Sequence, residues 1–198
     1  VFPGYTDENR NKGLFAGPDR YLRTGDLGRR DADGTLWITG RAKDLIIRGG
    51  HNIDPAIIEE TLAGHPDVAF VGAIGQPDAH AGEVPAAYVE LMDGGNASSE
   101  DLMAFCDEKI TERAAVPKFI EVMDELPKTA VGKVFKPDLR KSAINRIYGA
   151  AFSKAGIEAS INVIEDKKLG LVAHITSDAD DDAINDAIGA FPRPWQRA

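Results

Sequence analysis

Several features that mark other classes of protein are missing from this sequence. It has one cysteine, Cys106, among 198 residues, so an internal disulfide is excluded and a reducing, cytoplasmic location is expected. No stretch approaches the roughly 18 apolar residues that cross a bilayer, so no transmembrane segment is expected. Lysine and arginine number 23 against 32 acidic residues, and they are scattered. Because a nucleic-acid-binding surface needs a basic stripe, that class of function is not expected.

The sequence also lacks an initiator methionine and a signal peptide, since it begins Val1-Phe2-Pro3-Gly4. We therefore expect it to be part of a longer polypeptide. Its 43% of hydrophobic and 28% of charged residues, with 20 glycines and 11 prolines, suffice for one soluble domain and a fraction of another. Cys106 follows Leu102-Met103-Ala104-Phe105, which predicts a buried helical residue rather than a reactive thiol.

Turn and capping residues predict much of the secondary structure. Residues 21–38 hold two β-rich runs on either side of Asp33-Gly34, which predicts a β-hairpin. Asp54-Pro55 predicts the start of a helix, and Gly64 follows its end. Hydrophobic periodicity predicts further strands at 45–47, 67–74, 84–91 and 117–123, and further helices at about 99–113 and 138–155. The order is βαββαβ-like and indicates a small α+β domain from about residue 43 to 140.

The last part of the chain predicts a ββα arrangement, with β-like runs at 160–165 and 169–176 and a helix near 180–190. These elements either add a strand pair and a helix to the small domain or mediate self-association into a homodimer. The acidic run Asp180-Asp181-Asp182 is interpreted as a solvated helix start, where negative charge is favourable, rather than as a cation site. No metal site is predicted in this chain.

Two segments within the first 55 residues carry residues suited to binding. In Thr24-Gly25-Asp26 a carboxylate follows a glycine at a turn, where it can accept hydrogen bonds from two vicinal hydroxyls, as acidic residues do for ribose. Taken alone, the tripeptide favours the simpler interpretation of an ordinary turn aspartate. In the segment 40–55, Arg41 offers a fork of donors for hydroxyl or phosphate oxygens. Lys43 precedes an apolar strand, a suitable junction between two bodies, and Gly49-Gly50 either permits close approach of a ligand or forms a tight turn.

A third segment, Leu126 to Lys136, is a glycine-containing loop that presents three lysines, with Lys133 directly after Gly132. It is not an ATPase phosphate loop, because the first glycine of that pattern is missing and no Ser or Thr follows Lys133. Two interpretations stay open from these residues alone. The loop is either a solvated basic turn or the carrier of a mobile lysine that meets a carboxylate or phosphate.

Together, Tyr-x-x-Thr-Gly-Asp, Gly-Arg-x-Lys-Asp and Pro-Lys-Thr-x-x-Gly-Lys occur in the order and at the spacing of one family. From about residue 21 to 140 the chain resembles the carboxy-terminal part of the AMP-forming acyl-CoA synthetases, within the adenylate-forming superfamily that includes luciferase. The resemblance implies three parts: the end of a large N-terminal adenylating domain over 1–41, a small mobile C-terminal domain over 42–140, and an extension over 141–198.

The same resemblance implies a role for seven residues. Lys133 would be catalytic, bridging the carboxylate and the α-phosphate during adenylation. Asp26 and Arg41 would bind ATP and AMP, and Lys43 would be the hinge. Three further residues would line the tunnel for CoA, namely Gly49, Gly50 and His51.

The implied reaction activates a carboxylic acid, expected to be a fatty acid, with ATP and then transfers the acyl group to CoA. Mg²⁺ would be bound mainly by the missing N-terminal domain of the same chain, which is also the expected partner of these residues. The 198 residues alone are expected to be inactive. Two alternatives remain: an adenylation domain of a peptide-synthetase-like enzyme, and a non-catalytic binding module with this fold.

Overall fold

A computed structural model describes residues 2–198, which divide into two compact units. The first unit ends at Lys43, and the second runs from Asp44 to Ala198. The division in the chain thus falls at the residue expected to act as the hinge. Within residues 2–198, no helix is both long and apolar enough to cross a membrane.

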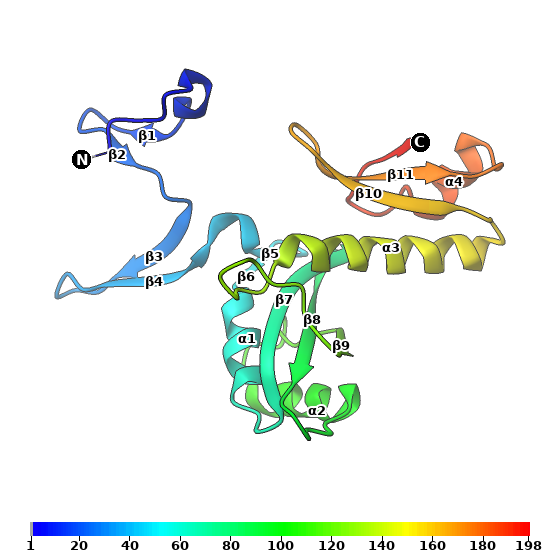
Figure 1. Cartoon of the computed structure of the whole chain (residues 1–198), viewed down its shortest axis with the longest axis horizontal. Helices are drawn as coiled ribbons and strands as arrows, with labels where there is room; N and C mark the ends of the chain where they lie inside the picture. Colours follow the sequence, from blue (N-terminus) through cyan, green and yellow to red (C-terminus); the bar gives the residue numbers. More distant parts are fainter. Residues whose placement is uncertain (1) are drawn as a thin grey trace. The chain divides into compact units, whose positions relative to one another are not determined.

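The first unit contains a short 3₁₀ helix and two small antiparallel strand pairs (Figure 1). Their bounds are η1 Glu8–Asn11, β1 Phe15–Ala16, β2 Tyr21–Leu22, β3 Asp26–Arg30 and β4 Leu36–Arg41. The predicted hairpin is confirmed as β3–β4, and Gly34 adopts φ +92° in its turn. The β1–β2 pair was not predicted, because two-residue strands carry no periodicity.

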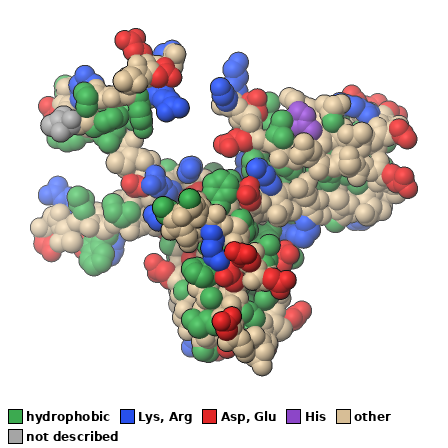
Figure 2. Space-filling model, viewed as in Figure 1, with side chains coloured by type: hydrophobic (Ala, Val, Ile, Leu, Met, Phe, Trp, Pro, Cys, Tyr) green, Lys and Arg blue, Asp and Glu red, His purple; other side chains and the backbone are tan. Residues whose placement is uncertain are grey.

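The β3–β4 hairpin leaves apolar side chains in solvent, and Figure 2 shows hydrophobic side chains on its surface. Leu36 and Ile38 are 73% and 74% exposed, and Trp37 is half-exposed. Because large apolar side chains rarely gather on the surface of a soluble protein, this hairpin is a candidate contact surface.

The second unit is built on a five-stranded sheet in the order β6-β5-β8-β7, with β9 also paired to β8. The strands are β5 Ile46–Arg48, β6 His51–Ile53, β7 Val68–Asp78, β8 Gly82–Leu91 and β9 Phe119–Met123. The predicted strands at 45–47, 67–74, 84–91 and 117–123 are thus confirmed, with β7 longer than expected. β7 continues through Pro77 because it is an edge strand, where a residue without an N–H group is tolerated.

Three helices accompany this sheet, α1 Pro55–Ala63, α2 Ser99–Lys109 and α3 Lys136–Ala155. α1 begins and ends where predicted: the Asp54 side chain accepts from the Ala56 N–H, and Gly64 is the C-cap. α2 is capped by a reciprocal Ser98–Asp101 box. It ends at Lys109 rather than at 113, because Ile110 has an extended backbone.

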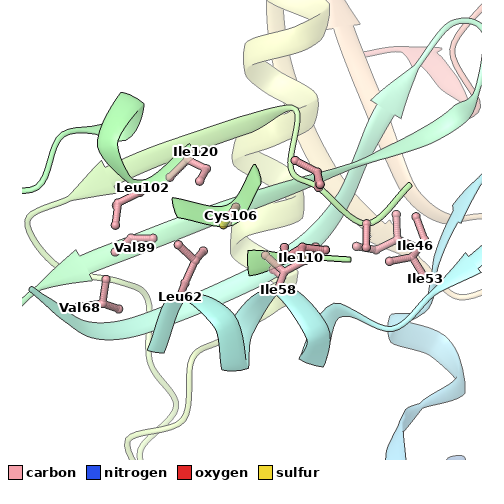
Figure 3. Close-up of a cluster of buried hydrophobic side chains, with 14 of the residues drawn as sticks. Ile46, Ile53, Ile58, Leu62, Val68, Val89, Leu102, Cys106, Ile110 and Ile120 are labelled. Atoms are coloured by element: carbon pink, nitrogen blue, oxygen red, sulfur yellow. The ribbon is translucent and has the colours of Figure 1, made fainter. Parts of the chain in front are cut away.

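The main core lies between the sheet and the helices α1 and α2 (Figure 3). Alternate residues of β8 face opposite sides of the sheet: Ala87 and Val89 belong to this core, whereas Ala86 and Tyr88 pack with residues of α3. Cys106 is fully buried in the main core, as predicted, and burial raises the pKa of its thiol to about 11.

The predicted ββα extension is confirmed and is part of the second unit. It comprises β10 Ser160–Asp166, β11 Gly170–Thr176, α4 Asp181–Ile188 and β12 Trp195–Arg197. The C-terminal half of α3 buries Tyr148 and Phe152 in a core shared with these elements. Helix α3 therefore runs between the five-stranded sheet and the β10–β11 pair (Figure 1). β12, which pairs in parallel with β11, was not predicted.

Candidate functional site

Asp26 and Arg41 face each other at the open end of the β3–β4 hairpin. They are register partners, and Arg41 Nε lies 2.8 Å from Asp26 Oδ1. Arg41 Nη1 also donates to the Thr24 carbonyl at 3.3 Å. The hairpin thus places the turn carboxylate beside the guanidinium, and the predicted nucleotide-binding pair is brought together. Both side chains stay partly exposed, so they remain accessible to a ligand.

Lys43 lies in a short 3₁₀ helix, η2 Ala42–Asp44, at the end of the first unit. The next residue, Asp44, is anchored: Arg140 Nη2 of α3 donates to its Oδ1 at 2.8 Å, and both side chains are largely buried. The chain is therefore fixed to the second unit directly after Lys43. Sequence spacing gave no signal for this pair, because its members are 96 residues apart.

Gly49 and Gly50 form a two-residue turn between β5 and β6, hereafter the glycine turn. Arg48 pairs with His51 across it, and both glycines have positive φ, +54° and +89°. This is the backbone of a type I′ hairpin turn, which glycine adopts without strain. A Cβ on either glycine would meet nothing within 4 Å, and His51 is exposed. The turn is therefore open to solvent, and its sequence signal, two glycines between short β-like runs, also indicates the unpredicted strand β6.

The lysine loop, residues 126–136, contains a tight turn stabilised by hydrogen bonds within the loop. Lys128 and Val134 form an isolated bridge, the Thr129 N–H donates to the Lys133 carbonyl at 2.7 Å, and Gly132 has φ +77°. The Lys133 N–H in turn donates to Thr129 Oγ1 at 3.2 Å. Thr129 therefore fixes the backbone of Lys133 from both sides, while the Lys133 side chain is exposed.

The three lysines of the loop differ in their partners. Lys128 Nζ lies 2.7 Å from Glu90 Oε2, and Lys136 Nζ lies 2.8 Å from Glu59 Oε1, both in partly buried positions. Among the described residues, Lys133 makes no ion pair. Two lysines are thus structural anchors, and the third is the ammonium group that the loop presents to solvent.

The carboxylate of Glu90 fastens the lysine loop to β8. It accepts the Leu126 N–H at 2.8 Å and binds Lys128 through both oxygens. These hydrogen bonds, that of Leu126 first, hold the pKa of Glu90 below its ordinary value. Lys128 also lies over the Phe70 ring of β7, 4.4 Å from its centroid.

The glycine turn and the lysine loop lie at opposite ends of one β-hairpin. The Gly49 N–H donates to the Ala81 carbonyl, in the turn between β7 and β8, whereas Lys128 binds Glu90 near the far end of β8. Gly82 and Glu90 belong to the same strand, and at about 3.3 Å per residue they are roughly 26 Å apart. The structure therefore does not bring Lys133 and the glycine turn together on one site.

The described residues contain no group of three or more His, Cys, Asp or Glu side chains arranged to hold a metal ion.

Comparison with protein families and curated proteins gives consistent matches. Residues 57–133 match the AMP-binding enzyme C-terminal domain. The chain is 46% identical over 177 residues to marinolic acid–CoA ligase from Pseudoalteromonas sp., covering 88% of this chain and 27% of that protein. It is 40% identical over 130 residues to indoleacetate–CoA ligase from Aromatoleum aromaticum, covering 66% of this chain and 25% of that protein. The chain thus spans about a quarter of the length of these relatives.

Solved structures agree in fold. ATP-bound MatB from Rhodopseudomonas palustris superposes with a TM-score of 0.65 at 34% identity, covering 72% of this chain and 28% of that one. The o-succinylbenzoate CoA synthetase of Bacillus subtilis, bound to its acyl-adenylate intermediate, gives a TM-score of 0.64 at 37% identity, covering 71% of this chain and 28% of that one. A fatty acyl CoA synthetase from Mycobacterium tuberculosis gives a TM-score of 0.51 at 33% identity, covering 72% of this chain and 28% of that one.

The α+β fold, the family domain matched over residues 57–133 and these relatives all indicate the same family. The chain belongs to the family of AMP-forming acyl-CoA ligases, of which it carries the C-terminal domain.

Proposed function

We propose that this chain is the C-terminal portion of an enzyme that joins a carboxylic acid to CoA with ATP as the energy source. The observation that carries the proposal is the difference among the three lysines of the lysine loop. Glu90 and Glu59 bind Lys128 and Lys136, whereas Lys133 is presented to solvent on a backbone fixed by Thr129. A purely structural loop would not need a positioned and exposed ammonium group.

In the first step, a carboxylate oxygen attacks the α-phosphorus of ATP. The new bond gives an acyl-adenylate, and the bond from the α-phosphorus to the leaving pyrophosphate breaks. Negative charge increases between two anions in the transition state, and a preorganised ammonium group stabilises it. We assign this role to Lys133. We propose that Asp26 accepts hydrogen bonds from the ribose hydroxyls. Its carboxylate is held by Arg41, whose Nε lies 2.8 Å from Asp26 Oδ1.

In the second step, the sulfur of CoA attacks the acyl carbonyl carbon, the thiol proton is released, and AMP leaves. We propose that the thiol arm of CoA approaches along the glycine turn and His51, because the turn is open and its two glycines carry no side chains. Since the lysine loop lies at the other end of the β7–β8 hairpin, one placement of the second unit cannot supply both elements to one acyl group. We therefore propose that this unit turns between the steps, with Lys43 as the hinge.

The class of acid is proposed from the similar proteins. The similar proteins named above act, by their names, on marinolic acid, indoleacetate, o-succinylbenzoate and fatty acids. We propose a fatty acid as the first class to test, and aromatic acids as the second.

The test uses the intact enzyme that contains this chain, with ATP, CoA and one acid at a time: octanoate, indoleacetate or 2-succinylbenzoate. The expected products are AMP, pyrophosphate and the acyl-CoA in equal amounts, and omission of CoA should stop thioester formation but not formation of the adenylate. Release of ADP instead of AMP would contradict the proposal. Adenylate formation with no transfer to CoA would favour the peptide-synthetase-like alternative, and no reaction would favour the binding module.

A further inference from the structure

The C-terminal extension reaches back to the five-stranded sheet through one arginine. Arg193 lies between α4 and β12, and its Nη2 is 2.5 Å from Oε1 of Glu83 in β8, 110 residues earlier in the chain. The Arg193 side chain is 31% exposed and that of Glu83 is 15% exposed. The contact is therefore more sheltered than an ordinary surface ion pair and is expected to restrict both side chains.

The backbone of Arg193 is also held. Its carbonyl accepts the hydroxyl of Tyr148 at 2.7 Å, and Tyr148 is fully buried in α3. The guanidinium therefore projects from a fixed point, and the extension acts on Glu83 as a rigid support rather than as a loose tail.

Glu83 in turn binds the strand that precedes the glycine turn. Its second oxygen, Oε2, accepts the Ile47 N–H at 3.2 Å. Room for the carboxylate exists because residue 75 of β7, which pairs with Pro85 two residues after Glu83, is glycine: a Cβ there would collide with Glu83. One carboxylate thus connects Arg193 of the extension with Ile47 of β5, two residues before Gly49.

Other contacts also hold the strand β5: Ile46 is buried in the main core, and Arg48 Nη1 donates to the Ala114 carbonyl at 2.7 Å. The backbone of β5 pairs with β8 at one register position, Arg48 with Gly82, and the Gly49 N–H donates to the Ala81 carbonyl at 2.8 Å. Since both residues of the glycine turn lack side chains, no side-chain packing fixes the turn itself. Its position therefore depends on how β5 is held, and the hydrogen bond from the Ile47 N–H to Glu83 is one of the contacts that hold it.

We propose that Arg193 and Glu83 form a brace through which the C-terminal extension positions the glycine turn for the thioester-forming step. Arg193 is a positioning residue that lies 60 residues beyond the part of the chain matched by the family domain. The proposal rests on the function proposed above. Its physical basis is that a small misplacement of a group that orients a reactant lowers the rate steeply.

The experiment compares Arg193→Ala, Arg193→Lys and Arg197→Ala in the intact enzyme, with octanoate, indoleacetate or 2-succinylbenzoate as the acid. Arg197 is the matched control, because it binds Asp181 at 2.7 Å within the extension and does not touch Glu83. Adenylation is followed by pyrophosphate release, and transfer by acyl-CoA formation from the prepared acyl-adenylate. Backbone hydrogen exchange of residues 47–51 is measured for each variant.

We expect Arg193→Ala to slow transfer about 10- to 100-fold, to leave adenylation within about twofold, and to speed exchange at 47–51. Arg193→Lys should keep most of the transfer rate, and Arg197→Ala should match the unsubstituted enzyme. Glu83→Ala should add little to Arg193→Ala, since both remove one brace. Equal losses in both steps, or equal effects of Arg193→Ala and Arg197→Ala, would show a general loss of stability and overturn the proposal.

The two proposals can fail separately. If the enzyme forms neither adenylate nor thioester with any of these acids, the proposed function fails, and the brace is judged by hydrogen exchange alone. Faster exchange at 47–51 in Arg193→Ala but not in Arg197→Ala supports the brace, and unchanged exchange refutes it.

Discussion

Glu90 holds Lys128 through both carboxylate oxygens, at 2.8 and 2.7 Å, although the two residues are 38 positions apart. The same carboxylate accepts the Leu126 N–H, so a single side chain of β8 fixes the start of the lysine loop. The loop then returns through Val134, which packs against Gly72 of β7. The exposed Lys133 is therefore carried by a loop that is tied to the sheet near both of its ends.

Glu90→Gln should weaken the fold, more so at neutral than at acidic pH. The pKa of Glu90 lies below its ordinary value of 4.5 in the folded state, so the folded state releases this proton more readily than the unfolded state. The stabilisation is then complete above about pH 4.5 and is lost as pH falls through the lower, folded-state pKa. We expect a loss of about 1–2 kcal/mol at pH 7, because charge-assisted hydrogen bonds are removed.

Chemical unfolding of the Glu90→Gln variant and of the unsubstituted protein, between pH 7 and pH 3, measures the difference between their free energies of unfolding. The gap between the two free energies of unfolding should narrow toward pH 3. A gap that stays constant across the range would mean that the Glu90 charge does not stabilise the lysine loop.

Lys133→Ala in the intact enzyme should slow adenylation on the order of 10²–10³-fold or more, the effect of removing a preorganised charge from the transition state. Transfer to CoA from supplied acyl-adenylate should be largely unchanged. Lys167→Ala, which removes an exposed lysine from the β10–β11 turn, is the control and should leave both steps intact. Equal losses of Lys133→Ala in both steps would disprove the role assigned to this lysine.

Whether the sequence predicts an element of this fold depends on how far apart in the chain the residues that determine it lie. Helix α1 was predicted to the residue, because Asp54, Pro55 and Gly64 act on the backbone next to them. The end of α2 was placed too late, because Leu102, Phe105, Cys106 and Ile110 keep a helical spacing up to the residue where the backbone becomes extended. β12 was missed because its pairing with β11 joins residues about 20 positions apart and leaves no local pattern.

The candidate site shows the same limit. The motifs single out Asp26, Arg41 and Lys133 as candidate site residues, and the structure shows the contacts that hold each of them in place. The supporting pairs could not be read from spacing, since Arg140 reaches Asp44 across 96 residues and Arg193 reaches Glu83 across 110. Such pairs exist only once the sheet has formed, so a sequence shows the candidate site residues before it shows which contacts position them.

Lys43→Pro should separate the two steps of the reaction. A hinge must change its backbone angles, and proline fixes φ near about −65°, so rotation at this point should be blocked. We expect measurable adenylation and no CoA-dependent product. Lys43→Ala keeps the backbone free and should support both steps. Normal acyl-CoA formation by Lys43→Pro would place the hinge elsewhere, for example at Asp44, which Arg140 holds to α3.

The last prediction concerns the 198-residue chain on its own. The β3–β4 hairpin exposes about three quarters of the side chains of Leu36 (73%) and Ile38 (74%), and exposed apolar strands tend to associate with one another. We expect the chain to self-associate with increasing concentration in sedimentation experiments. Replacing both residues, Leu36→Lys with Ile38→Lys, should abolish this association.

The matched control replaces two exposed apolar residues of the second unit, Ile164→Lys with Leu169→Lys, which are 42% and 52% exposed. If association depends on the first-unit hairpin, this control keeps it, because the β3–β4 surface is untouched. Loss of association in the control, with the hairpin variant unaffected, would instead place the contact on the β10–β11 pair. Because α1, α2 and α3 pack on the sheet of the second unit, thermal unfolding of that unit should be the same in the hairpin variant as in the unsubstituted chain.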